Sequence, residues 1–198
     1  CDFPTEKWNG KTMTWTLADI CANDDGGNTK AEGYNVTGAA DTGDDFGGGR
    51  DLDHTRQNVR DNIKTYLSFL LTDLGYDGFR YDMVKGYAAH YIGEYNTSAN
   101  PKFSVGEYWD GDVQKVKGWI DGTRANGAIQ SAAFDFPMKY TINDAFGQGR
   151  WGRLADATLA ADQAYSRYAV TFVDNHDTGR PKENGGAQLY ANVLAANA

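Results

Sequence analysis

Four short apolar runs, each followed by a helical pattern, constrain the fold of this chain most strongly. The runs lie at 78–83, 103–107, 132–136 and 168–173, and helical patterns occur at 58–74, 86–95, 113–120, 140–146, 154–165 and 188–198. In the first helical pattern, apolar residues recur every three or four positions until Gly75 ends it. Because strand and helix alternate four times, the sequence predicts parallel strands with right-handed crossovers, and therefore an α/β fold.

Residues 1–53 have a different character, because they lack regular periodicity and are rich in Gly, Asp and Asn. Long irregular loops in compact proteins are functional or disordered. Trp8, Trp15 and Leu17 lie in this segment and indicate that it packs. We therefore expect an irregular insertion domain at 1–53, held by something besides a hydrophobic core, and a regular α/β domain at 54–198.

The charge and the hydropathy exclude two classes of partner. The chain has 27 acidic and 19 basic residues, a net charge of −8, and no basic cluster that would neutralise phosphates. We therefore expect no nucleic acid partner. No apolar run approaches the roughly 18 residues that a membrane-spanning helix needs, so we expect no membrane span.

The first residue and the cysteines bear on processing and location. The sequence opens on Cys1 without an initiator Met or a signal peptide, which indicates a mature or clipped segment of a longer polypeptide. Cys1 and Cys21 would form one disulfide in an oxidising compartment, but two unpaired buried thiols are an equally common arrangement. We expect an extracellular, periplasmic or cell-surface location.

Polar side chains fall at the carboxyl ends of the apolar runs. They are Arg80 and Asp82 after the first run, Glu107 after the second, Asp135 after the third, and Asp174, His176 and Asp177 after the fourth. Parallel α/β folds assemble their active sites at this edge of the sheet. A carboxylate taken alone is more often a helix cap or a solvated loop residue, but the recurrence after every run favours a site.

Carboxylates gathered at one edge suit the cleavage of a glycosidic bond, which needs an ionised nucleophile and a protonated acid. Arg80 and Asp82 are two residues apart, so on a strand they share a face and the guanidinium favours the ionised carboxylate. Glu107 follows an apolar run and precedes Tyr108 and Trp109, surroundings that raise the pKa of a carboxyl group. Asp82 is therefore the predicted nucleophile and Glu107 the predicted acid.

Three motifs and their order resemble the α-amylases of glycoside hydrolase family 13. They are GFRYD at 78–82 with VKG at 84–86, VGEYW at 105–109 and FVDNHD at 172–177, with DLDH at 51–54 and FDF at 134–136 in the expected places. The sequence is most similar to plant-type and maltooligosaccharide-forming α-amylases. The resemblance implies part of a (β/α)8 TIM barrel, namely strands four to seven with their helices, preceded by the irregular insertion.

The resemblance also implies retaining endo-hydrolysis of α-1,4-glucosidic bonds in starch, glycogen or maltooligosaccharides. By position, Asp82 matches the nucleophile, Glu107 the acid/base, and Asp177 the carboxylate that stabilises the transition state. The residues that match substrate-binding positions are Arg80, Lys85, Gly86 and His176. Trp109 adjoins Glu107 and is the tryptophan that we expect to contact sugar.

A calcium site is the predicted role of the acidic loop. Asp41, Asp44 and Asp51 supply the oxygen ligands that calcium prefers, in a Gly-rich stretch whose backbone carbonyls can turn inward. The residues alone leave two interpretations open, a calcium loop and a solvated acidic turn. The resemblance favours calcium, and it matches these three positions and the carbonyl of Gly86 to a structural calcium that ties the insertion to the barrel.

Two other functions remain open. One is a non-catalytic glucan-binding relative, or an inactive fragment, since the chain lacks segments that resemble strands one to three and eight. The other is an α-glucan transglycosylase, in which a sugar hydroxyl rather than water opens the intermediate. The presence of Asp82, Glu107 and Asp177 together favours the hydrolase.

Overall fold

The computed structural model describes residues 6–8, 11–23, 28–40, 42–44, 46–47 and 49–178. The chain forms two compact units. The first unit consists of Cys1–Ser104 and Gly122–Ser131, and the second of Val105–Asp121 and Ala132–Ala198. The expected domains 1–53 and 54–198 are not tested by this division and stay a prediction.

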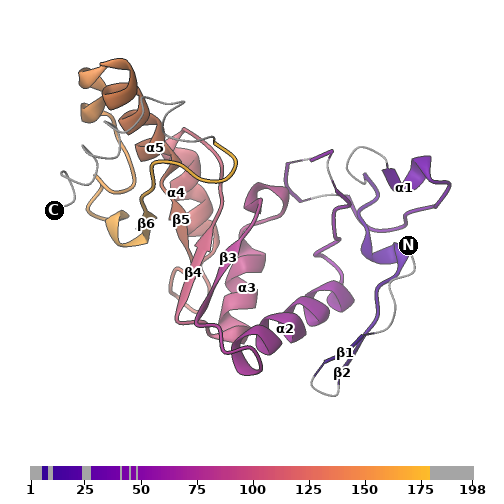
Figure 1. Cartoon of the computed structure of the whole chain (residues 1–198). Helices are drawn as coiled ribbons and strands as arrows, with labels where there is room; N and C mark the ends of the chain where they lie inside the picture. Colours follow the sequence, from indigo (N-terminus) through magenta and orange to yellow (C-terminus); the bar gives the residue numbers. More distant parts are fainter. Residues whose placement is uncertain are drawn as a thin grey trace. The chain divides into compact units, whose positions relative to one another are not determined.

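The N-terminal part of the first unit contains regular structure where the sequence predicted an irregular loop. Strands β1 (Glu6–Trp8) and β2 (Lys11–Met13) pair antiparallel, with Glu6 opposite Met13. A 3-10 helix (Leu17–Asp19) and the short helix α1 (Asn28–Ala31) follow (Figure 1). The hairpin was missed because strands of three residues are too short to show an alternation of apolar and polar positions.

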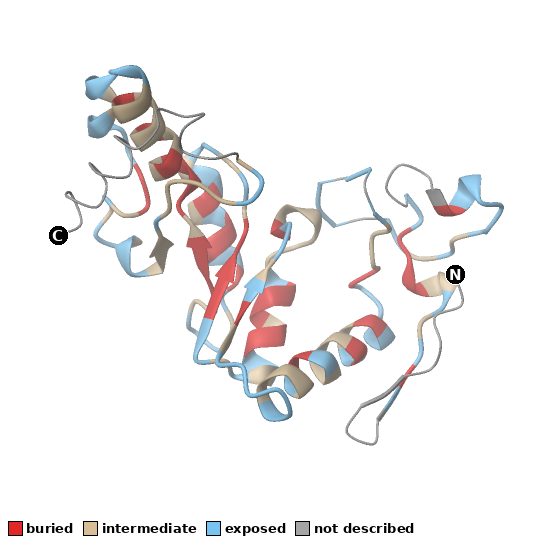
Figure 2. Ribbon diagram, in the orientation of Figure 1, coloured by how far each residue is buried: buried red, intermediate tan, exposed pale blue. Residues whose placement is uncertain are grey.

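Helix α2 (Gln57–Thr72) confirms the helix expected at 58–74. It ends near the predicted position, where Gly75 has a φ of 73°, in the left-handed region that glycine adopts readily. Helix α3 (His90–Ala99) packs against α2. The buried side chains that α3 brings to the core of this unit are Tyr91, Ile92, Tyr95 and Asn96 (Figure 2).

Polar side chains hold the segment after β2 against α2. Asp19 is buried, and its two carboxylate oxygens accept hydrogen bonds from Arg56 Nε at 3.2 Å and Asn58 Nδ2 at 3.0 Å. Asn62 Nδ2 donates to the carbonyl oxygen of Thr14 at 2.9 Å. A buried carboxylate is stable only when it is hydrogen-bonded or paired. These donors therefore attach the loop to the helix.

The four apolar runs form the strands of one sheet, which confirms the predicted α/β fold. The strands are β3 (Gly78–Tyr81), β4 (Phe103–Gly106), β5 (Ala132–Phe134) and β6 (Ala169–Val170), in that order across the sheet. Strands β4 and β5 pair in parallel, as do β5 and β6. Helices α4 (Val113–Gly122) and α5 (Phe136–Ile142) follow β4 and β5 (Figure 1). Parallel strands that alternate with helices are the repeating unit of a (β/α)8 barrel.

The prediction of a helix at 154–165 is wrong. A short 3-10 helix, Trp151–Ala155, is followed by turns. The amide of Ala161 donates to Thr158 Oγ1 at 3.1 Å instead of to a helical carbonyl, and short polar side chains compete with helical hydrogen bonds in this way. The helix expected at 188–198 lies outside the described residues.

Two further expectations concern the cysteines and a membrane span. Cys21 is buried, but Cys1 lies outside the described residues, so the disulfide stays a prediction. Within the part of the chain that the structure describes, no helix is long and apolar enough to cross a membrane.

Candidate active site

Strand β3 ends at a pair of oppositely charged side chains. Along the strand Phe79 is buried, whereas Arg80 and Asp82 are exposed. Tyr81 donates its hydroxyl hydrogen to Asn96 Oδ1 at 2.9 Å. Arg80 Nη1 lies 2.5 Å from Asp82 Oδ1. The contact expected from their two-residue spacing is present, and it places a positive charge beside the predicted nucleophile.

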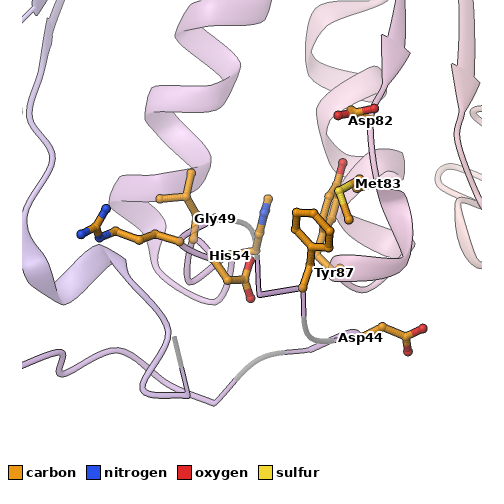
Figure 3. Close-up of a pocket in the computed structure, with 11 residues that line it drawn as sticks. Asp44, Gly49, His54, Asp82, Met83 and Tyr87 are labelled. Carbon is orange, nitrogen blue, oxygen red and sulfur yellow. The ribbon is translucent and has the colours of Figure 1, made fainter. Parts of the chain in front are cut away.

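Asp82 begins a turn that lines a pocket in the first unit. Met83 has a φ of 42°, and the 3-10 helix Val84–Gly86 follows. A non-glycine residue in this left-handed region is uncommon and often lies at a functional site. The pocket has a volume of about 240 Å³ and is lined by Asp82, Met83, Gly86, Tyr87, Asp44, Phe46, Gly49, Arg50, Asp51, Leu52 and His54 (Figure 3).

His54 and Tyr87 contribute an aromatic wall to this pocket (Figure 3). Their rings stack, with centroids 4.4 Å apart and planes inclined by 11°. His54 is buried, and its Nδ1 lies 2.6 Å from the hydroxyl oxygen of Tyr95. Burial raises the pKa of Tyr87, and the charge of Asp82 raises it further, so the Tyr87 hydroxyl group stays protonated. Spacing along the chain did not identify this wall, because His54 and Tyr87 are far apart in the sequence.

Three of the four predicted calcium ligands line the same pocket, namely Asp44, Asp51 and Gly86. The amide of Asp44 donates to the carbonyl of Lys85 at 2.8 Å, and Asp44 Oδ2 lies 3.2 Å from Lys85 Nζ. Asp41 lies outside the described residues. Among the described residues, no three His, Cys, Asp or Glu side chains are grouped closely enough to hold a metal ion. The donors are oxygens, which fits calcium, and the site itself stays a prediction.

Glu107 follows β4 in the second unit and is only 4% exposed. A Cβ on Gly106 would lie 2.1 Å from the Trp119 ring, and the ring of Tyr108 lies 6.1 Å from that of Trp119. Gly106 and Tyr108, on either side of Glu107 in the sequence, therefore both lie near Trp119 of helix α4. This burial agrees with the apolar and aromatic neighbours of Glu107 in the sequence.

Trp109 is 37% exposed and contacts two residues of helix α5. Its ring stacks on Phe136, with centroids 4.9 Å apart, and its Nε1 donates to the Tyr140 hydroxyl oxygen at 2.8 Å. The sequence analysis missed Tyr140. The available signal was its spacing, because Phe136 and Tyr140 are four residues apart and share a helix face.

Asp135 is a helix cap, although it ends the third apolar run as the other carboxylates end theirs. It is fully buried. Its Oδ1 accepts the amide of Met138 at 3.0 Å, and its Oδ2 accepts the amide of Ala160 at 2.8 Å. Because backbone amides use both oxygens, the interpretation of an isolated carboxylate as a cap is right for this residue.

The residues after β6 form a turn with two of the predicted site residues. His176 Nε2 lies 2.9 Å from Asp177 Oδ2, and Asn175 Oδ1 accepts the amide of Asp177 at 3.1 Å. Burial lowers the pKa of Lys139 in α5, and the carboxylate of Asp174 partly offsets that effect. The negative charge of Asp174 in this turn therefore acts on the buried amine of Lys139.

The structure divides the predicted site residues between the two units. The first unit holds Asp44, Asp51, Arg80, Asp82, Lys85 and Gly86, and the second holds Glu107, Trp109, His176 and Asp177. Within the first unit, Asp82 shares a pocket with Asp44, Asp51 and Gly86. The catalytic and binding roles of all these residues stay predictions.

Sequence similarity to known proteins shows which family this chain belongs to. The chain is 40% identical to a probable α-amylase 2 of Arabidopsis thaliana over 159 aligned positions, which cover 72% of this chain and 37% of that relative. It is 32% identical to a glucan 1,4-α-maltotetraohydrolase of Stutzerimonas stutzeri over 185 positions, which cover 83% of this chain and 31% of that relative. The chain belongs to the α-amylase family. It spans about a third of the length of these two curated relatives, and no protein-family model matches it.

Solved structures share the fold of this chain. An α-amylase from Malbranchea cinnamomea superposes with a TM-score of 0.59 at 21% identity, over 79% of this chain and 33% of that one. A cyclomaltodextrin glucanotransferase superposes with a TM-score of 0.62 at 20% identity, over 95% of this chain and 39% of that one. The four strands and their helices are thus part of a (β/α)8 barrel, as predicted.

Proposed function

We propose that this α-amylase chain carries out retaining endo-hydrolysis of α-1,4-glucosidic bonds in starch, glycogen or maltooligosaccharides. The proposal rests on the different surroundings of two carboxyl groups. Asp82 is exposed and lies 2.5 Å from Arg80, whereas Glu107 is buried. These environments suit an ionised nucleophile and a protonated acid. The names of the curated relatives, α-amylase and maltotetraohydrolase, support an α-glucan as the substrate.

The reaction takes two steps. In the first, a carboxylate oxygen of Asp82 attacks the anomeric carbon while Glu107 gives its proton to the leaving glycosidic oxygen. The bond between that carbon and that oxygen breaks, and a glycosyl ester remains on Asp82. In the second step, ionised Glu107 takes a proton from water, the water oxygen attacks the same carbon, and Asp82 is released. Two inversions at one carbon retain the α configuration.

The other site residues act on charge and position. Arg80 holds the attacking oxygen in place through its contact with Asp82. Asp177 stabilises the positive charge that develops on the sugar ring, and His176, 2.9 Å from it, binds around the cleaved sugar. Lys85 and Gly86 bind on the leaving-group side, and Trp109 offers its ring to a neighbouring glucose unit.

Calcium is part of the proposal as a structural ion. Asp44, Asp51 and the carbonyl of Gly86 would hold it together with Asp41, and all but Asp41 line one pocket. When bound, the ion supplies positive charge that neutralises the carboxylates. In the described residues, Lys85 Nζ lies 3.2 Å from Asp44 and neutralises part of that charge.

Release of reducing ends from soluble starch tests the proposal. Glu107→Gln should lower the rate by about 100-fold or more, because the amide cannot donate the proton. Glu94→Gln is the matched control, since Glu94 pairs with Lys64 on the surface of α2 and α3. It should leave the rate unchanged. Glucan binding without any release of reducing ends would favour the non-catalytic relative, and longer oligosaccharides as main products would favour the transglycosylase.

A further inference from the structure

Helix α5 holds the indole of Trp109 on two sides. The ring of Phe136, which is fully buried, stacks on one face with the planes inclined by 26°. The polar edge is held by Tyr140, whose hydroxyl oxygen accepts the Nε1 hydrogen at 2.8 Å. Phe136 stacks on one face of the indole and Tyr140 accepts its N–H hydrogen, while 37% of Trp109 remains exposed.

Tyr140 is placed by rigid surroundings. It lies on a helix that the buried carboxylate of Asp135 caps, and Lys139 Nζ lies 4.7 Å from the centroid of its ring. Gly111 leaves room for that ring, because a Cβ at Gly111 would lie 3.3 Å from Tyr140 Cδ2. Trp109, in contrast, lies in a segment without regular structure. Side chains on helices are held more firmly than those on loops, so Tyr140 orients Trp109 rather than the reverse.

We infer that Tyr140 is a positioning residue whose hydroxyl group fixes the Trp109 indole, so that its open face stacks against a glucose ring of an α-glucan. The inference rests on the proposed function. An aromatic ring that is oriented before binding loses less conformational freedom when the sugar arrives. Because the indole N–H is donated to Tyr140, Trp109 contributes its ring face rather than a hydrogen bond to the sugar.

A double-mutant cycle on the whole chain tests the inference, in a Glu107→Gln background that prevents turnover and with maltoheptaose as the probe. Tyr140→Phe should raise the Kd about three- to tenfold, because one orienting hydrogen bond is lost. In a Trp109→Phe chain, which has no indole N–H, Tyr140→Phe should change the Kd by less than about twofold.

The matched control is Tyr165→Phe, which removes a hydroxyl bond of 2.6 Å to Asp121 in the same unit. It should leave the Kd unchanged. A second readout needs no sugar. The indole N–H resonance of Trp109, identified by its loss in Trp109→Phe, should shift in Tyr140→Phe and not in Tyr165→Phe.

The possible failures are distinguishable. If maltoheptaose binds and Tyr140→Phe weakens binding equally with or without Trp109, or has no effect, the inference is overturned and the proposed function stands. An unshifted Trp109 resonance in Tyr140→Phe overturns the inference as well. If the Glu107→Gln chain does not bind maltoheptaose at all, the proposed function fails and the inference fails with it.

Discussion

Arg80 Nη1 lies 2.5 Å from Asp82 Oδ1 at the carboxyl end of β3. The two side chains are 35% and 66% exposed, and ion pairs this open to solvent contribute little to stability. A guanidinium is planar and can hold a carboxylate in one direction, which an ammonium group does not do. We therefore expect the pair to affect the proposed reaction more than the fold.

Arg80→Lys separates these two effects. We expect kcat/KM for maltooligosaccharides to fall at least about tenfold, while the free energy of unfolding changes by less than about 1 kcal/mol. Initial rates and urea unfolding of the same preparations measure both quantities. A variant that loses stability but keeps its specific activity would contradict this role.

The candidate site could be predicted from the sequence where spacing along one strand decides the contact. Arg80 and Asp82 meet because residues two apart share a strand face. The same reasoning did not distinguish Asp135 from Glu107, since both follow a short apolar run. Their difference depends on the amide of Ala160, which reaches Asp135 from 25 residues away. Contacts between distant segments leave no periodic signal.

Asp135→Asn should destabilise the second unit. The amide side chain has one acceptor oxygen, so one of the two backbone amides that Asp135 binds would face an NH₂ group. We expect a loss of about 2 kcal/mol in the free energy of unfolding. Asp112→Asn is the control, because exposed Asp112 caps α4 through a bond to the amide of Gln114. Equal losses for the two variants in urea unfolding would argue against a contribution from the second hydrogen bond of Asp135, the one to the amide of Ala160.

Gly106→Ala tests the close approach of β4 and α4. The new Cβ would lie 2.1 Å from the Trp119 ring, so we expect a loss of about 1 to 3 kcal/mol in stability. Gly118→Ala is the matched control, because Gly118 lies inside α4 and its Cβ would meet nothing within 4 Å. That variant should gain about 0.5 to 1 kcal/mol. Thermal unfolding of both variants measures the difference, and similar shifts would refute the packing argument.

Calcium should stabilise the chain after treatment with a chelator. An ion present at about 100 times its Kd adds about 2.7 kcal/mol to the stability of the native state, and the melting temperature should rise accordingly. Asp51→Asn should reduce the rise, because Asp51 lines the pocket with Asp44. Asp61→Asn, on the exposed side of α2, should not reduce it. A melting temperature that calcium leaves unchanged in the parent chain would count against the site.

The fold was predictable where each element carries its own pattern. Helix α2 has a clear apolar stripe and a glycine at its end, and its expected position is confirmed. The segment 154–165 also contains apolar residues at helical spacing, but Thr158 draws the amide of Ala161 to its side chain. The spacing of apolar residues does not reveal that a side chain competes with the helix for this backbone amide.

The anomeric form of the first sugar released tests the central claim most directly. Proton NMR of maltoheptaose hydrolysis, recorded before the products mutarotate, distinguishes the α anomer from the β anomer. Attack by Asp82 followed by attack of water on the same carbon predicts that the α anomer appears first. Initial release of the β anomer would show direct attack by water and would contradict Asp82 as the nucleophile.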